Sequence, residues 1–241
     1  MADPLAERPV VAGGSEPIAV PEEPVAGLRL LHPQESSRPV GAPTPAWLPT
    51  VFCASGFSAL VYQVVWQRVL FAAFGINVEA VTVVVTAFLA GLGVGSLLGG
   101  RAATGSDASL LRGFGVLETT IGVFGLASLP FFRWVGDVTL GLSSVEQGLI
   151  TVLIVMVPTT LMGATLPLLV GYLVRSNGNV GRTVGTLYFV NTAGSALAAF
   201  TAVLLLLRTL GGQRSTWIAA GLNLAVGTFV LLGPWRTSRR G

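Results

Sequence analysis

The amino-acid sequence predicts an all-α membrane protein, a polytopic bundle of about six transmembrane helices behind a proline-rich N-terminal tail. Of its 241 residues, 52% are hydrophobic and only 10% are charged, whereas about a quarter of the residues in soluble domains are charged. With so few charges, much of the protein surface must face lipid. Ten of the fourteen prolines lie before residue 50, which separates a tail from an apolar body. The predicted domains are a disordered Pro-rich tail, 1–46, a six-helix transmembrane domain, 47–235, and a short basic C-terminal tail, 236–241.

The N-terminal tail is expected to be disordered on its own. Its Pro, Glu, Ser and Gly residues follow neither a helical nor a strand period. A segment of this composition cannot bury enough apolar surface to offset its ordering entropy. It also lacks the basic start and the long apolar core of a secretory signal peptide. The alternative interpretation is a segment that becomes ordered against a partner protein.

Six apolar stretches in the body are long enough to cross a hydrocarbon core of about 30 Å. Each is expected to be a helix, because lipid offers no hydrogen-bond partner to backbone amides. Tryptophans near the predicted helix ends, Trp66 among them, are expected to lie at the level of the lipid headgroups. Residues 131–145 are expected to include a short interfacial helix. The predicted spans are 47–70, 78–100, 113–133, 147–172, 184–207 and 215–235.

The placement of arginine predicts the orientation of the bundle. An even number of spans puts both termini on one side of the membrane. Cytoplasmic segments carry an excess of positive charge, so the side with more arginines is expected to be cytoplasmic. We therefore expect a multi-pass protein of the bacterial cytoplasmic (inner) membrane with both termini in the cytoplasm. The terminal side holds Arg101, Arg112, Arg175, Arg182, Arg236, Arg239 and Arg240, and the opposite side holds Arg68, Arg133, Arg208 and Arg214.

The sequence shows no catalytic machinery. Cys53 and His32 are the only cysteine and histidine, which excludes an intramolecular disulfide and a Cys/His metal cluster. No strand leads into a glycine-rich phosphate loop, and no catalytic triad or paired-carboxylate site is visible outside the predicted spans. The glycine-rich part of 91–100 lies in the middle of a predicted span, so we discount a dinucleotide loop there. The expectation is a protein that is not an enzyme, with no catalytic residue, metal site or cofactor and no nucleic-acid partner.

Small residues and prolines mark two features of helix packing. Gly91, Gly95 and Gly99 recur at four-residue spacing, which lets two helix backbones approach closely. Packing inside the bundle is the favoured interpretation, and a homodimer seam is the alternative. Pro158 and Pro167 are expected to kink the fourth helix. Such a kink is either structural or part of a broken helix that lines a transport cavity.

A few polar side chains at membrane depth form a candidate intramembrane polar site. Glu118 lies about a turn and a half into the third predicted span, and a buried carboxylate needs a partner or a proton. A hydrogen bond to a glutamine, Asn191 or Asn223 is favoured over a proton relay. The two asparagines are expected to link helices. The candidate site comprises Gln63, Arg68, Glu118, Asn191 and Asn223.

Two strings of the body are specific: Gly-Ala-Thr-Leu-Pro at 163–167 and Leu-Tyr-x-x-Asn-Thr at 187–192. Together with further stretches of the body, they resemble the membrane portion of the spermidine-synthase-like membrane proteins. That family joins a major-facilitator-like membrane domain to a cytoplasmic polyamine synthase domain. The resemblance therefore implies a half-major-facilitator-like helical bundle. The similar stretches are 55–70, 87–103, 158–170, 181–200 and 222–232.

Departures from the family pattern bear on function. This sequence has no synthase domain, so the aminopropyl-donor site and the catalytic acid of the family have no counterpart in it. Gln63 stands where the resemblance implies a glutamate. Thr104 and Gly105 stand where it implies an acid–arginine pair, in a loop that resembles the conformational latch of major facilitator transporters. The loss of these charges argues against transport.

These observations predict a non-catalytic membrane subunit, a scaffold or accessory component of a larger membrane assembly. Its expected partners are the lipid bilayer and other membrane protein subunits, with a homodimer as a further option. Two alternatives stay open. One is a membrane anchor for a separately encoded polyamine-synthase-like enzyme. The other is a dimeric half-transporter for a small polar or cationic solute.

Overall fold

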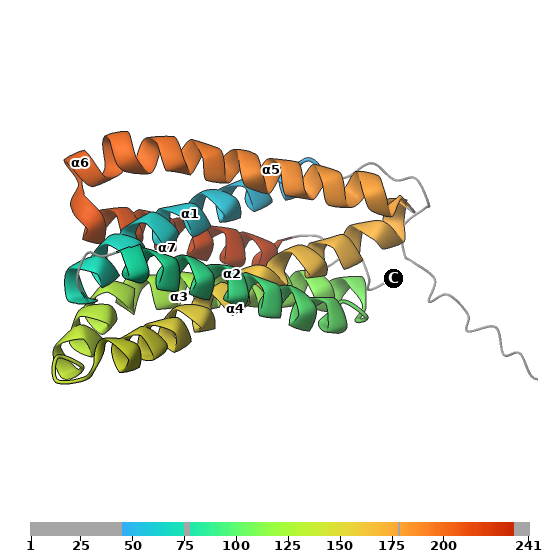
Figure 1. Ribbon diagram of the computed structural model, residues 1–241. Helices are drawn as coiled ribbons and strands as arrows, with labels where there is room; N and C mark the ends of the chain where they lie inside the picture. Colours follow the sequence, from blue (N-terminus) through green and yellow to red (C-terminus); the bar gives the residue numbers. More distant parts are fainter. Residues whose placement is uncertain (1–44, 75–77, 178, 234–241) are drawn as a thin grey trace, which may run out of the picture. The chain divides into compact units, whose positions relative to one another are not determined.

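The computed structural model describes residues 45–74, 78–177 and 179–233 (Figure 1). Within these ranges all regular secondary structure is helical, and six helical segments are long and apolar enough to cross a membrane. The fold is therefore the all-α, multi-pass bundle that the sequence predicts. The predicted tails lie outside the described residues, except for Pro45 and Ala46.

The six spans alternate in direction along the chain. The start of α1 lies beside the end of α7, where the rings of Trp47 and Phe229 are 5.9 Å apart (Figure 1). We call this the proximal end of the bundle, and we call the other end, where α1 ends and α7 begins, the distal end. The first four spans are α1 (Trp47–Phe74), α2 (Val78–Ala102), α3 (Asp107–Val138) and α4 (Ser144–Asn177). The fifth comprises α5 (Val180–Thr201), the π-helix η1 (Ala202–Leu206) and α6 (Leu207–Thr209), and the sixth is α7 (Gly211–Leu232).

The third span is longer at both ends than the sequence predicts. Ser106 caps its start, because the Ser106 hydroxyl accepts a hydrogen bond from the backbone N–H of Ser109. The helix therefore begins at Asp107, and Glu118 lies about three turns inside it rather than a turn and a half. At the distal end α3 continues to Val138.

The predicted interfacial helix between α3 and α4 is wrong. Residues 136–138 continue α3, and a turn at 139–143 leads directly into α4. Thr139 closes this turn: its backbone N–H donates to the carbonyl of Val135 (3.1 Å), and its own carbonyl accepts from Leu142 N (3.0 Å) and Gln147 Nε2 (2.8 Å). These bonds satisfy the backbone at the helix end and leave no segment for a separate helix.

The predicted proline kink in α4 does not interrupt the helix. Pro158 and Pro167 both lie inside one continuous α4, and Pro130 lies in the same way inside α3. The irregular backbone of the bundle is instead in the fifth span, where η1 inserts a π-helical turn between α5 and α6. A broken fourth helix is therefore not part of this structure.

The glycine strip of α2 faces α4. A Cβ on Gly91, Gly95 or Gly99 would collide with α4, so the strip provides packing inside the chain and is not free to form a homodimer seam. The colliding atoms belong to Thr159, Thr160 and Ala164. The contact is reciprocal, because Gly163 of α4 lies against the carbonyl of Leu92 in α2.

The contact between α1 and α5 has the same form. Gly194 of α5 lies against the carbonyl of Cys53, and Gly56 of α1 lies against the carbonyl of Asn191. On each helix the glycine follows the contacted carbonyl by three residues, as on α2 and α4. Ser195 adds a hydrogen bond from its hydroxyl to the carbonyl of Gly56 (3.0 Å).

These contacts divide the bundle into two halves of three spans each. The carbonyl–glycine unit 53–56 recurs 107 residues later as 160–163, and the unit 92–95 recurs 99 residues later as 191–194. Hence α1 corresponds to α4, and α2 corresponds to α5. The remaining helices, α3 and α7, pack on each other through Gly115 and Gly227, each of which lies against the carbonyl of the other. Because each half has an odd number of spans, the second half is inverted relative to the first.

An aromatic cluster fills the core between α1 and α3. Trp66 is fully buried, stacks on Tyr62 with ring centroids 4.8 Å apart, and donates from Nε1 to the Ser128 hydroxyl (3.0 Å). Phe132 meets its edge at 5.5 Å. Trp66 therefore faces the interior of the bundle, and its predicted place at the headgroup level stays a prediction. Ser128 satisfies the indole N–H inside the bundle, so the ring does not need the polar interface.

Candidate functional site

The structure brings two of the predicted site residues together in the core. The Asn223 side-chain amide of α7 donates to Glu118 Oε2 of α3 (2.5 Å), and the Ser55 hydroxyl of α1 donates to Glu118 Oε1 (2.5 Å). Glu118 is 0% exposed. These three residues, which we call the polar cluster, therefore join three helices through one carboxylate.

The other predicted residues lie elsewhere. Asn191 links α5 to α1 by donating to the carbonyl of Phe52 (3.4 Å), and Gln63 is half-buried on α1. Arg68 is exposed near the distal end of α1. The five residues are therefore distributed over separate places and do not form one site.

The polar cluster has no counterpart in the other half of the bundle. The spacing that relates Gly56 to Gly163 relates Ser55 to Met162. The spacing between Gly115 and Gly227 likewise relates Glu118 to Val230 and Leu111 to Asn223. Met162, Val230 and Leu111 are all buried apolar residues. The helical packing alone therefore does not require a carboxylate at this depth.

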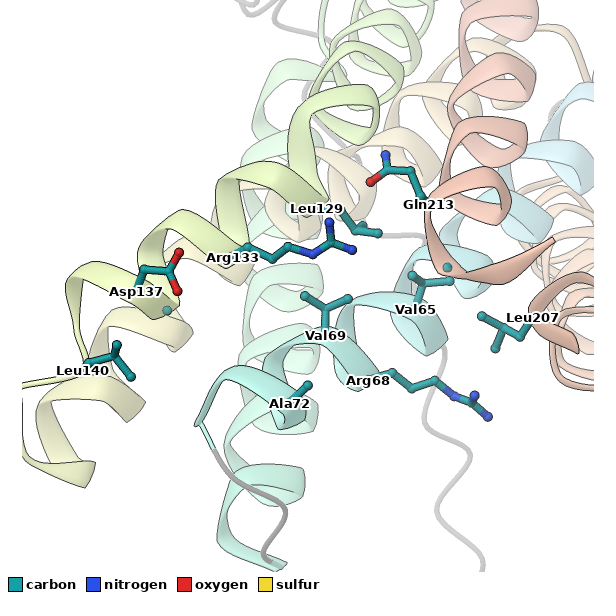
Figure 2. A pocket seen from close by; sticks show the side chains of 12 residues that line it. Val65, Arg68, Val69, Ala72, Leu129, Arg133, Asp137, Leu140, Leu207 and Gln213 are labelled. Carbon is teal, nitrogen blue, oxygen red and sulfur yellow. The ribbon is translucent and has the colours of Figure 1, made fainter.

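A cavity of about 570 Å³ opens at the distal end between the ends of α1 and α3 and the start of α7 (Figure 2). We call it the distal pocket. Figure 2 shows Arg133 extending from α3 toward Val69 and Gln213, with Asp137 one turn further along α3. The distal pocket is lined by Val65, Arg68, Val69, Ala72, Leu129, Arg133, Gly136, Asp137, Leu140, Leu207, Gly212 and Gln213.

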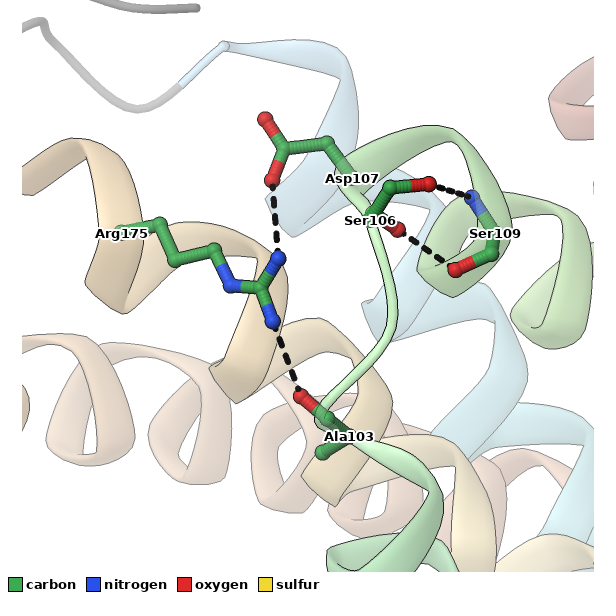
Figure 3. Close-up of polar contacts among 5 residues, drawn as sticks. All are labelled: Ala103, Ser106, Asp107, Ser109 and Arg175. Atoms are coloured by element: carbon green, nitrogen blue, oxygen red, sulfur yellow. Dashed lines mark hydrogen bonds and ion pairs between the residues drawn. The ribbon is translucent and has the colours of Figure 1, made fainter. Parts of the chain in front are cut away.

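The proximal end carries an ion pair across the loop between α2 and α3 (Figure 3). Arg175 of α4 lies 3.8 Å from the carboxylate of Asp107, and its other guanidinium nitrogen donates to the carbonyl of Ala103 (3.3 Å). In this loop Thr104 and Gly105 stand where the family resemblance implies an acid–arginine pair. An acid is nevertheless present slightly later, at the first residue of α3.

Sequence reasoning missed four residues that shape these sites: Ser55, Asp107, Arg133 and Gln213. Ser55 carried no signal, because serine is common in membrane helices and its helical partner was unknown. Asp107 had a usable signal, since it follows the capping Ser106 at a helix start. Arg133 entered the prediction only through the orientation of the bundle. Gln213 lies next to the end of a predicted span, where a polar residue is common.

Comparisons of this chain with protein-family models, with curated proteins and with solved structures find no match. The resemblance to the spermidine-synthase-like membrane proteins stays a prediction from the sequence stretches named above.

Proposed function

We propose that the protein is a non-catalytic membrane subunit that acts through lateral contact with another membrane protein. The observation that carries this proposal is the low burial of the fifth span. Only 17% of the residues in its apolar stretch are buried, compared with 33% to 44% in the other five spans. The helix packs mainly on α1 and to a lesser extent on α4, so most of its surface faces outward.

The outward surface of α5 suits a helix–helix contact. Gly185, Thr192, Ala196 and Ala199 are exposed at helical spacing, and a Cβ on Gly185 would meet no atom within 4 Å. Small and hydroxyl side chains let membrane helices approach closely and form hydrogen bonds between them. We call these four residues the outer strip of α5. The next least buried span is α2, which is the counterpart of α5 in the other half.

Photo-crosslinking in native membranes tests this function. A photo-reactive amino acid at Thr192 or Ala196 is expected to form one discrete crosslinked species of higher mass. The same amino acid at Val123, which is 56% exposed on α3, serves as the control and is expected to yield none. Equal crosslinking at all three positions, or none at any, would contradict the proposal.

A matched pair of substitutions adds a second measurement. Gly185→Leu and Gly221→Leu both place a leucine on an exposed helical glycine with open space around it. Gly185→Leu is expected to release the partner in mild-detergent extracts, whereas Gly221→Leu on α7 keeps it. The readout is the mass of the complex in size-exclusion chromatography with light scattering.

A dimeric half-transporter is the second candidate, favoured by the inverted repeat and by the buried carboxylate of Glu118. It predicts a crosslinked species of twice the chain mass. It also predicts that Glu118→Gln abolishes uptake of a polyamine or another small solute into proteoliposomes, while Glu146→Gln at the exposed start of α4 leaves uptake intact. Unchanged uptake in the Glu118 variant leaves the subunit function preferred.

The proposal includes the bacterial cytoplasmic membrane as location, with both termini in the cytoplasm. The loops at 103–106 and 139–143 lie at opposite ends of the bundle, which supports opposite sides of the membrane. Cysteines introduced at 105 and 141 in a Cys53→Ala background are expected to react with an impermeant reagent from the cytoplasmic and the outer face, respectively. Labelling of both from one face would contradict this topology.

A further inference from the structure

The distal pocket contains two arginines that no group in the described part of the chain neutralises. Within the described ranges neither Arg68 nor Arg133 makes an ion pair or a side-chain hydrogen bond. Among the described lining residues Asp137 is the one acid, and it lies beyond ion-pair distance of both arginines. These described residues therefore carry a net positive charge and unused guanidinium donors.

The start of α7 adds further donors to the same pocket. Its first turn contains no acidic residue, and no side chain caps its backbone N–H groups. Gly212 and Gln213 from this turn line the cavity. The Gln213 Nε2 atom is buried without a hydrogen-bond partner. Uncapped N–H groups at the start of a long helix favour a negative charge beside them.

The other half of the bundle contains a related arginine that does have an acidic partner. The spacing that relates Gly56 to Gly163 also relates Arg68 to Arg175. Arg175 faces the start of α3 and pairs with Asp107 there, as Figure 3 shows. Arg68 lines the distal pocket together with Gly212 and Gln213 of α7, whose first turn contains no acid. The spacing that relates Gly115 to Gly227 relates Asp107 to Ala219, a buried apolar residue, so the related position holds no carboxylate.

We propose that the distal pocket binds the phosphate group of an anionic ligand, held by Arg68, Arg133, Gln213 and the backbone N–H groups at the start of α7. Two arginines and oriented N–H groups match the several oxygens of a phosphate better than those of a single carboxylate. This inference is independent of the proposed subunit function, because the pocket lies apart from the outer strip of α5.

Two sources can supply this phosphate. One is the headgroup of an anionic phospholipid, since the pocket lies at the ends of the spans, where headgroups reside. The other is a free phosphate-bearing solute. The cavity of about 570 Å³ is larger than inorganic phosphate needs and falls in the range of small-molecule pockets.

Native mass spectrometry of the full chain with phosphatidylglycerol or with phosphatidylethanolamine tests whether the phosphate belongs to a lipid headgroup. Phosphorus NMR with inorganic phosphate tests whether it belongs to a free solute. We expect Arg68→Gln and Arg133→Gln each to weaken binding about tenfold or more, because each removes charge-assisted hydrogen bonds. Arg214→Gln is the matched control: it removes the same charge beside Gln213, but Arg214 is exposed and does not line the pocket. Its binding is expected to stay within about twofold of the original.

Two further variants separate binding from folding. Gln213→Glu places a carboxylate beside the arginines and is expected to abolish binding without lowering the thermal unfolding temperature. Asp137→Asn removes the acid of the pocket and is expected to tighten binding, a gain that misfolding cannot produce. If Gln213→Glu loses binding of phosphatidylglycerol and the original chain binds no inorganic phosphate, the ligand is a lipid headgroup. If Gln213→Glu also loses binding of inorganic phosphate, the ligand is a free anion.

Three results would overturn the inference. The first is equal weakening by Arg214→Gln and by the pocket variants, which indicates unspecific charge attraction. The second is no preference for phosphatidylglycerol over phosphatidylethanolamine together with no binding of inorganic phosphate. The third is unchanged binding in Gln213→Glu.

Discussion

The two ends of the bundle differ in the surroundings of two related arginines. At the proximal end Arg175 meets Asp107 and the carbonyl of Ala103, and the loop is held by these contacts. At the distal end the corresponding Arg68 meets no acid, and a cavity is present instead. One acidic residue at a helix start therefore distinguishes a closed end from an open one, although the helices that support both ends pack alike.

The cores of the two halves differ in the same sense. The two reciprocal glycine–carbonyl contacts, α2 with α4 and α1 with α5, each join one half to the other and are related by the repeat. Only one place in this common packing holds a polar cluster, because the positions related to Ser55, Glu118 and Asn223 are apolar. The packing of the helices therefore depends on the glycines. The buried carboxylate and the open pocket are features that this packing does not require.

The largest expected effect tests the common packing. Gly95→Leu and Gly194→Leu each force a side chain against backbone atoms of the neighbouring helix, so each is expected to lower the free energy of unfolding by about 3 kcal/mol. Reversible unfolding in mixed micelles measures this energy. Gly93→Leu, on the exposed face of α2, is the control and is expected to change it by less than about 0.5 kcal/mol. A tolerated Gly194→Leu would show that the two halves are not packed alike.

An intermediate effect tests whether the polar cluster is dispensable. Glu118→Leu leaves Ser55 and Asn223 buried without their acceptor and is expected to cost about 2 kcal/mol of unfolding free energy. The triple variant Ser55→Ala, Glu118→Leu, Asn223→Leu removes the unsatisfied partners and is expected to recover to within about 1 kcal/mol of the original. A triple variant that is less stable than the single one would show that the cluster is required by the fold.

The smallest effect sharpens the comparison of the two ends. Arg175→Gln is expected to cost about 0.5–1 kcal/mol, because its ion pair with Asp107 is partly exposed. Arg68→Gln removes no ion pair or side-chain hydrogen bond within the described residues, and it is expected to change the unfolding free energy by less than about 0.3 kcal/mol in ligand-free detergent. Combining Arg175→Gln with Asp107→Asn is expected to cost no more than Arg175→Gln alone, since one interaction is lost in both. Equal costs for the two arginines would contradict the distinction between a closed and an open end.

The membrane helices could be predicted because their signal is local. Apolar runs of sufficient length identified all six spans, and helix formation follows from the lack of hydrogen-bond partners in lipid. The partner of a buried side chain could not be predicted in this way. The sequence around Trp66 does not indicate that its indole donates to Ser128, sixty-two residues further along the chain.

The sequence by itself determined the all-α class and the number of spans, and it showed that Glu118 needed a buried partner. Hydropathy and the cost of a buried carboxylate act within one helix, so a single chain of letters contains them. Only the tertiary structure decided that Ser55 and Asn223 satisfy Glu118, that the glycines of α2 meet α4, and that Arg175 has an acid while Arg68 does not. Those outcomes depend on which helices lie side by side, and in a membrane that choice rests on close packing between segments far apart in the sequence.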